Sequence, residues 1–344
     1  MKAAILYGPG DLRYEETATP KIGENDVLVK VKACGVCGSD IPRVMEKGVA
    51  YFYPLIPGHE FSGYAAELGN KVSGIKKGER FAVIPIIPCG KCQYCSKGRY
   101  FHCKKYDYLG SRSNGGFAEY VKVPVDNLVK LPKEIDFENA ALVEPLAVAF
   151  HVLKRVGLKK GESLAVFGLG TVGNLIGQLA VHLGAKSVIG VDIDEQKLRI
   201  AQRAGLKLLI NGQKNNAVEE ILRKRKGVGM DATIEAAGSM VALDQVIRVT
   251  GNLGRVGLVG RAEKDTVIPW STFALILRKE LSLLGVWGFE PIESWKKCLR
   301  IMAEGVIKTE PLVTHRIGLA ETGSIIKKMY QRKGFFNKVL VMPE

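Results

Sequence analysis

The sequence lacks any long apolar run. No stretch of its 344 residues approaches the roughly 20 consecutive apolar residues of a membrane-spanning helix. The first eight residues, MKAAILYG, resemble a strand rather than a cleavable signal, so we predict a cytoplasmic protein with no membrane partner. Aromatic residues are few, at 8%, but a hydrophobic content of 47% in a chain of this length is enough for two domain cores.

A concentrated basic tract is also missing. The formal net charge is +15, yet lysines and arginines are spread along the chain, with only short clusters at 223–226 and 327–333. Solvated helix faces explain such clusters better than a nucleic-acid-binding stripe. A basic balance also suits an anionic small substrate, because positive potential raises its local concentration. We therefore expect a small-molecule substrate and no nucleic-acid partner.

Internal repeats and low-complexity segments are absent. Before about residue 132 the chain instead shows short extended runs separated by Gly, Pro and Asn turns. These runs lie at 27–33, 61–68, 80–87 and 118–123. The pattern predicts a mainly β region that forms a barrel.

The pattern changes after residue 144. Apolar strand-like runs such as SLAVFG, SVIGVD and DATIEAAG alternate with helical stretches such as VGNLIGQLAVHLGA. This alternation predicts an α/β domain with a doubly wound parallel sheet of the Rossmann type. Six strands complete that sheet, so the tail, with a last strand at 338–341, is expected to return to the first domain. We predict a catalytic domain of residues 1–147 and 288–344 and a nucleotide-binding domain of residues 148–287.

A glycine-rich turn follows the first strand of the second domain. Gly168, Gly170 and Gly173 form a GxGxxG motif with Thr171 and Val172, between a strand and a helix. Its glycines allow a tight turn, close approach of a pyrophosphate, and close helix–strand packing. The motif alone is a weak signal, but this setting favours dinucleotide binding.

An acidic residue follows this motif at the distance expected for a ribose contact. Asp192 ends the second strand of the domain, and a carboxylate there accepts hydrogen bonds from an adenosine ribose. Its charge would repel a 2′-phosphate, so NAD is favoured over NADP. The alternative is that Asp192 only caps the next helix. Lys197, Val259 and Val286 are further predicted cofactor contacts.

Four of the seven cysteines lie within fifteen residues. Thiolates at this spacing can complete a tetrahedral zinc shell that leaves no position for a reactant. A reducing compartment argues against disulfides, although unligated cysteines remain an alternative. We predict a structural zinc lobe over residues 89–103, with ligands Cys89, Cys92, Cys95 and Cys103.

A catalytic zinc site needs three protein ligands and an open position. Cys37, His59 and Glu144 are candidates, but they lie far apart, and spacing alone does not assemble them. A helical HExxH motif is absent, because Gly63 occupies the second histidine position. This absence excludes a protease that binds zinc through that motif.

Motifs along the whole chain nevertheless resemble one family. The segment Gly58-His59-Glu60, followed by Gly63, Gly69 and Val72, matches the zinc signature of the zinc-containing medium-chain alcohol and polyol dehydrogenases. The cysteine lobe and the nucleotide turn come in that family's order. The resemblance implies a GroES-like barrel beside a Rossmann domain, two zinc ions per chain, and NAD.

The resemblance also implies residue roles. Cys37, His59 and Glu144 would bind the catalytic zinc, with Glu60 as a fourth ligand or as a residue that orients a ligand. Ser39 would take the substrate hydroxyl proton, although a serine in such a turn can instead bond to local backbone. Many relatives carry a histidine shortly after this serine, whereas here Ile41-Pro42-Arg43 follow Asp40. The outward route of the proton must therefore differ.

Within the family, several segments resemble members that act on a phosphorylated polyol. These segments are CGSDIPRVMEKG, YPLIPGHEFSGY, KYDYLGSRSNGGFAEY and EPLAV. The implied reaction is oxidation of a sugar alcohol phosphate, best represented by galactitol 1-phosphate giving tagatose 6-phosphate. Arg43 is the first candidate for a phosphate contact, and Arg112 and Lys47 are further candidates.

Other functions remain open from the sequence alone. An unphosphorylated polyol or diol, such as sorbitol, xylitol or 2,3-butanediol, is an alternative substrate. A zinc-ribbon nucleic-acid binder would leave the glycine turn and Asp192 without a role, and a silent family member that only binds NAD would not need a full ligand set. Relatives suggest a homodimer or homotetramer.

Overall fold

The computed structural model describes residues 1–262, 265–290 and 292–343. The chain divides into two compact units. The first unit comprises residues 1–144, 290–304 and 313–344, and the second comprises 145–289 and 305–312. We predicted residues 305–312 in the first domain, but Gln178 of the second unit accepts a hydrogen bond from the Lys308 backbone N–H at 2.7 Å.

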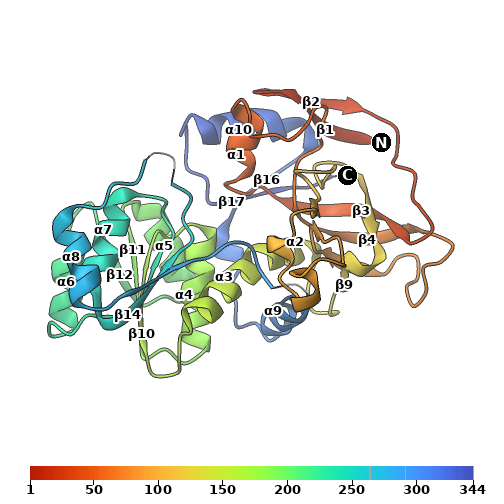
Figure 1. Cartoon of the computed structure of the whole chain (residues 1–344). Coiled ribbons are helices and arrows are strands. Elements are labelled where there is room, and N and C mark those ends of the chain that lie inside the picture. The colour runs from red at the N-terminus through yellow and green to blue at the C-terminus, as the bar shows by residue number, and fades with distance from the viewer. Residues whose placement is uncertain (263–264, 291, 344) are drawn as a thin grey trace. The chain divides into compact units, whose positions relative to one another are not determined.

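The first unit is built on a seven-stranded sheet. Its strands come from both ends of the chain, since the C-terminal strand pairs antiparallel with an N-terminal one (Figure 1). The order is β16 (Val313–Ile317), β17 (Lys338–Val341), β3 (Asp26–Gly35), β4 (Glu60–Leu68), β5 (Arg80–Val83) and β9 (Leu128–Lys130), and β8 (Tyr120–Pro124) also pairs with β3.

Smaller elements complete the first unit. They are the hairpin of β1 (Lys2–Gly8) and β2 (Asp11–Glu16), the pair of β6 (Ile86–Ile87) and β7 (Asp107–Tyr108), and the helices α1 (Asp40–Met45), α2 (Phe137–Ala141), α9 (Glu293–Ala303) and α10 (Thr322–Tyr330). The single strand predicted at 80–87 is wrong, because it is split into β5 and β6. Pro85 lies at the break and has no N–H to donate to a neighbouring strand.

The second unit holds a six-stranded sheet in which every pairing is parallel. Its order is β12 (Leu208–Asn211), β11 (Ser187–Asp192), β10 (Ser163–Phe167), β13 (Met230–Glu235), β14 (Thr250–Leu258) and β15 (Ser282–Gly285). The order reverses direction between β10 and β13, which is the arrangement of a doubly wound sheet. The predicted fold class of this domain is confirmed.

One helix precedes the first of these parallel strands, and five more connect the strands in turn. They are α3 (Val143–Val156), α4 (Thr171–His182), α5 (Glu195–Arg203), α6 (Ala217–Lys224), α7 (Met240–Val249) and α8 (Trp270–Arg278). Gly184 and Gly205 follow α4 and α5 with φ of 83° and 101°. This left-handed conformation ends a helix at low cost only for glycine.

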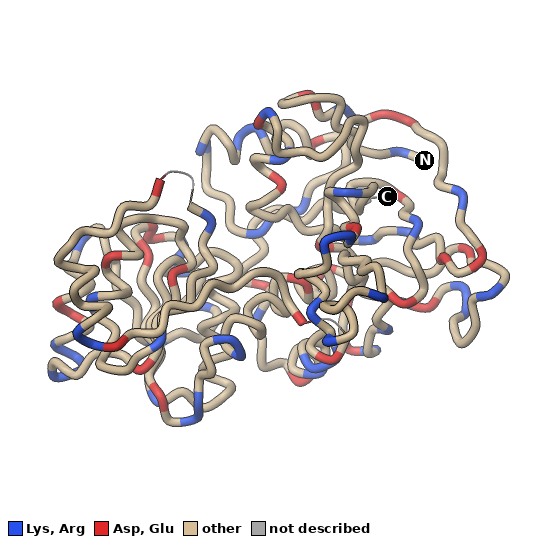
Figure 2. Tube along the Cα trace, viewed as in Figure 1, with Lys and Arg blue, Asp and Glu red and all other residues tan. Residues whose placement is uncertain are grey.

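Charged side chains are distributed over both units. Figure 2 shows Lys and Arg scattered along the whole trace with acidic residues among them. None of the helices in the described part of the chain combines the length and apolar character that a membrane span requires.

Candidate active site and cofactor sites

The four clustered cysteines come together in the first unit. Their sulfur atoms all lie within 4.8 Å of one another, and no disulfide joins them. Cys95 lies in a single-turn helix, Cys95–Lys97, and Sγ of Cys92 is 3.4 Å from its sulfur. The backbone N–H of Lys91 lowers the pKa of Cys89 to about 6, which favours the thiolate. Four soft donors at this separation fit a structural zinc ion.

A second group of possible metal ligands forms between β3 and β4. Cys37 follows β3, whereas His59 and Glu60 stand at the start of β4. One ligand atom from each of the three lies within 4.8 Å of those of the other two. Gly35 pairs with Glu60 across the sheet, and a Cβ on Gly35 would overlap the Glu60 carboxylate. The glycine therefore makes room for this side chain.

Asp40 organises the cysteine and the histidine of this group. It is fully buried, and Oδ2 accepts a hydrogen bond from the Cys37 backbone N–H at 3.0 Å. Its Oδ1 lies 3.3 Å from Nδ1 of His59, which leaves Nε2 for a metal ion. Burial opposes a charged His59 imidazole, yet Asp40 and Cys37 raise its pKa well above the usual value. The surroundings therefore favour positive charge at this point.

Arg43 belongs to the same group of polar contacts around Asp40. Its Nη1 donates to Oδ1 of Asp40 at 2.6 Å, and the pair is largely buried. The guanidinium charge is thus balanced inside the protein. Because Arg43 already pairs with the Asp40 carboxylate, Arg43 is a weaker candidate for a phosphate contact.

Glu60 is held by a cation from the other end of the chain. Nζ of Lys338 lies 2.5 Å from Oε2 of Glu60, and both side chains are at most 3% exposed. Lys338 also donates to the Val36 carbonyl at 3.0 Å. Burial alone would lower the pKa of Lys338, but Glu60 raises it above its ordinary value. One carboxylate oxygen of Glu60 is therefore already bonded to Lys338 where Glu60 lies beside Cys37 and His59.

Glu144 lies beside this group, outside the set whose ligand atoms are all within 4.8 Å of one another. It occupies the first turn of α3 and is buried, and the Tyr108 hydroxyl donates to its Oε1 at 3.2 Å. The Tyr108 ring is in turn 5.6 Å from that of His59. Burial raises the pKa of Glu144 to about 7.

The chemistry of these side chains fits a catalytic zinc ion. A thiolate, an imidazole and carboxylates are the ligand types of catalytic zinc sites, and buried acidic side chains favour a cation among them. Cys37, His59 and one or both glutamates would hold the ion. Ser39 lies two residues from Cys37 and is partly exposed, and its side chain makes no capping hydrogen bond to α1.

The glycine turn has the predicted geometry in the second unit. Gly168 has φ of 95°, and a Cβ there would meet the backbone of Ala236 and Ala237. A Cβ on Gly173 would overlap the Gly168 carbonyl oxygen, so this glycine allows close helix packing. Gly170 precedes α4 and faces open space. Thr171 and Val172 form the first turn of α4, as a pyrophosphate site at a helix N-terminus needs.

Asp192 ends the strand beside this turn. Its carboxylate accepts hydrogen bonds from the backbone N–H groups of Leu169 at 2.7 Å and Asp194 at 2.9 Å. The helix cap of α5 is Asp194, which bonds to the N–H groups of Gln196 and Lys197. The alternative of Asp192 as that cap is therefore wrong. Lys197 lies in the first turn of α5, partly buried.

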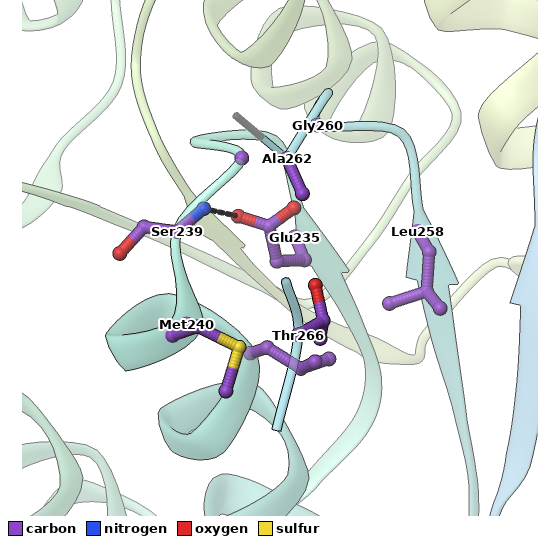
Figure 3. A pocket seen from close by; sticks show the side chains of 9 residues that line it. Glu235, Ser239, Met240, Leu258, Gly260, Ala262 and Thr266 are labelled. Carbon is purple, nitrogen blue, oxygen red and sulfur yellow. Dashed lines mark hydrogen bonds between the residues drawn. The ribbon is translucent and has the colours of Figure 1, made fainter. Parts of the chain in front are cut away.

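A pocket of about 380 Å³ lies at the carboxyl ends of β13 and β14 (Figure 3). Glu235 ends β13, and its buried Oε1 accepts from the N–H groups of Ala237 at 2.9 Å and Ser239 at 3.3 Å. Val259 and Val286 follow β14 and β15 at the same edge, joined to these strand ends by backbone hydrogen bonds. Ligands of such sheets bind outside this edge.

Three residues that contact the candidate catalytic metal ligands were not predicted. Asp40, Tyr108 and Lys338 each contact a candidate ligand directly. Asp40 stands three residues after a cysteine, a local signal that could have identified it. Lys338 is 278 residues from Glu60, and no local pattern connects them.

Known proteins resemble the chain over its whole length. Residues 23–133 match the family described as alcohol dehydrogenase GroES-like domain, and residues 171–304 match zinc-binding dehydrogenase. Galactitol 1-phosphate 5-dehydrogenase of Escherichia coli is 35% identical, with all of both chains covered. Sorbitol dehydrogenase of Bacillus subtilis is 32% identical, covering 100% of this chain and 97% of the relative.

Solved structures of related dehydrogenases have the same fold as this chain. A crystal structure of galactitol-1-phosphate dehydrogenase from Escherichia coli has a TM-score of 0.93 and 34% identity and covers 100% of both chains. A zinc-binding dehydrogenase from Sinorhizobium meliloti, bound to NADP, has a TM-score of 0.91 and 31% identity, with 99% of each chain covered. This chain therefore belongs to the zinc-dependent medium-chain alcohol and polyol dehydrogenases, oxidoreductases with a GroES-like domain and a Rossmann-type nucleotide-binding domain that use NAD(P).

Proposed function

We propose that the enzyme oxidises a secondary hydroxyl group of a phosphorylated polyol and transfers the hydride to NAD. The observation that carries this proposal is the meeting of Cys37, His59 and Glu60, with Glu144 beside them. The similarity to galactitol 1-phosphate 5-dehydrogenase supports galactitol 1-phosphate as substrate. Its oxidation would give tagatose 6-phosphate.

The protein residues divide the work of this reaction. Cys37, His59 and a glutamate would hold a zinc ion, which would supply Lewis-acid chemistry by lowering the pKa of a substrate hydroxyl group toward neutral pH. Asp40 orients the His59 ring through Nδ1. Ser39 would accept the hydroxyl proton, since it lies two residues from Cys37 and its own hydroxyl group is not used in a capping hydrogen bond to α1. Pro42 cannot relay that proton, so it leaves through water or a ribose hydroxyl.

The cofactor site favours NAD. The Gly168–Gly173 turn would hold the pyrophosphate, and Asp192 would accept hydrogen bonds from the adenosine ribose. Its buried carboxylate, already fixed by Leu169, would repel a 2′-phosphate at the same place. The NADP bound by one relative makes this preference a point to test.

The direct experiment measures NADH formation with a panel of polyols and their phosphates. We expect kcat/KM to be higher for galactitol 1-phosphate than for galactitol, sorbitol, xylitol and 2,3-butanediol.

Metal analysis should find about two zinc ions per chain. Loss of about one zinc and of activity in His59→Ala, with the fold intact, would support the ligand role. Equal kcat/KM for a polyol and its phosphate would reject the phosphorylated substrate.

A further inference from the structure

Arg112 is held between two tyrosine rings on the surface of the first unit. Its guanidinium carbon lies 4.6 Å from the ring centre of Tyr51 and 4.0 Å from that of Tyr106. Nη1 donates to the Tyr106 carbonyl at 3.1 Å, and Nη2 donates to the Tyr51 hydroxyl at 3.2 Å. Stacking on two rings and two hydrogen bonds fix the position of this cation.

The charge of Arg112 is not balanced by a neighbouring acid. Its partners are a carbonyl, a phenol and two aromatic faces, and no carboxylate pairs with it among the residues that the structure describes. Arg43, in contrast, is bonded to the buried carboxylate of Asp40. A guanidinium carries five N–H donors, so Arg112 keeps donors free for an anion.

A row of aromatic rings links Arg112 to the candidate zinc ligands. The Tyr106 ring, on which the guanidinium stacks, is 6.4 Å from the Tyr108 ring. Tyr108 contacts the His59 ring and donates its hydroxyl to Glu144. These rings thus form a continuous row between the cation and the ligands within the first unit. A substrate that spans it would carry its reacting hydroxyl and its anionic group several carbon atoms apart.

We propose that Arg112 is the anion subsite of the enzyme and binds the terminal phosphate monoester of the polyol substrate. The proposal rests on the proposed function and adds the residue that gives the substrate preference. A planar guanidinium forms paired hydrogen bonds with phosphate oxygens, and one already held by two rings loses little freedom on binding. The polyol chain would run along the Tyr106 and Tyr108 rings, toward the candidate ligands.

The test compares one substrate pair across three variants. In Arg112→Gln we expect kcat/KM for galactitol 1-phosphate to fall about 10- to 100-fold, mainly through KM, because charge-assisted hydrogen bonds are lost. Activity with galactitol should stay unchanged. Arg112→Lys keeps the charge but not the paired geometry, so its loss should be intermediate. Lys77→Gln removes an exposed charge of the first unit that has no predicted role and should behave like the wild type.

Inorganic phosphate gives a second readout that does not depend on turnover of galactitol. It should inhibit the wild type in competition with substrate, and this inhibition should weaken at least tenfold in Arg112→Gln but not in Lys77→Gln. An unchanged preference for the phosphorylated substrate in Arg112→Gln would overturn the role of Arg112 while leaving the proposed function intact. Equal loss on both substrates would also overturn it, since Arg112 would then be a structural residue. A wild type without any preference would instead reject the proposed function itself.

Discussion

The buried charged residues at the candidate sites of this enzyme each have a protein partner. Asp192 bonds to two backbone N–H groups, Asp40 to Cys37 and Arg43, and Glu60 to Lys338. Burial makes an unpaired charge costly, so such residues are fixed by several bonds at once. The effects of Asp192 and of the Lys338–Glu60 pair can be tested singly, because the chain offers a matched control residue for each.

The charge of Asp192 should decide between the two nicotinamide dinucleotides. We expect Asp192→Asn to lower the ratio of kcat/KM for NAD to that for NADP by about tenfold or more, because repulsion of a 2′-phosphate is removed. Asp194→Asn is the matched control, since Asn caps a helix as well as Asp does. Steady-state kinetics with both cofactors measure the ratio. A ratio that shifts equally in the two variants would contradict this role.

The pair of Lys338 and Glu60 should matter for stability far more than an exposed pair. Lys338→Met leaves a buried carboxylate without its cation and should lower the free energy of unfolding by about 3–5 kcal/mol. The Lys71–Glu24 pair has the same 2.5 Å separation, but its side chains are 64% and 56% exposed. Lys71→Met should therefore cost less than about 1 kcal/mol. Urea unfolding with zinc present compares the two, and similar losses would refute the argument.

At the scale of elements, the cysteine lobe has little regular structure of its own. Between Cys89 and Cys103 the chain forms only two single-turn helices, Cys95–Lys97 and Tyr100–His102. The backbone hydrogen bonds within this segment close only short local turns, so we expect a bound metal ion to supply much of its rigidity. The four sulfur atoms are the points through which that rigidity would be imposed.

Trypsin should report the state of this lobe. We expect Cys103→Ser to lower bound zinc by about one ion per chain and to speed cleavage after Lys91, Lys97 and Arg99 at least tenfold. Cleavage after Lys76, in the exposed turn between β4 and β5, should not change. Peptide mass spectrometry measures both rates. If the lobe resisted trypsin without its metal, zinc would not be what orders it.

Periodicity in the sequence predicted the elements of the second unit well and those of the first less well. All six strands of the parallel sheet were anticipated, because buried parallel strands are continuous apolar runs between turns. Strand β16 was not anticipated, since VTHRI is short and half polar. The short helices α1 and α2 contain Pro42 and Asn139, so propensity gave no clear signal.

The candidate sites also divide into those that local sequence patterns predicted and those that they did not. The cysteine lobe and the glycine turn are local patterns, and the structure brings their residues together. The set of Cys37, His59, Glu60 and Glu144 came from resemblance, because its members meet only through the pairing of β3 with β4 and the start of α3. Spacing along the chain carries no information about such contacts. Arg43 is an example of a contact that the sequence could not predict, since only the structure shows that its guanidinium pairs with the Asp40 carboxylate.

At the scale of the whole molecule, the second unit exposes an apolar edge. Strand β15 ends the six-stranded sheet, and Trp270 and Leu277 on α8 are 76% and 59% exposed. Trp287, just after β15, is 71% exposed. Large exposed side chains of this kind, and the outer side of a strand that ends a sheet, are each typical of protein–protein contacts. We therefore expect a second copy of the chain to cover them.

A single charge on this surface should weaken the association. We expect the wild type to sediment as a dimer or tetramer and Leu277→Asp to shift the mass toward that of a monomer, because a carboxylate would be desolvated at the contact. Val181→Asp is the control, since Val181 is exposed on α4. Sedimentation equilibrium measures the masses. A wild-type monomer, or an unchanged Leu277→Asp assembly, would show that the contact lies elsewhere.

The pairing of β17 with β3 sets the order in which the protein can be completed during translation. The strands of the second unit are contiguous in the chain, from Ser163 to Gly285, and can assemble as soon as they leave the ribosome. The first unit must wait for residues 338–341, and until then Cys34 and Gly35 at the end of β3 lack their partner strand β17 and the Glu60 carboxylate lacks its cation. A polypeptide terminated a few codons early would therefore retain a folded nucleotide-binding unit but leave its catalytic half unfinished.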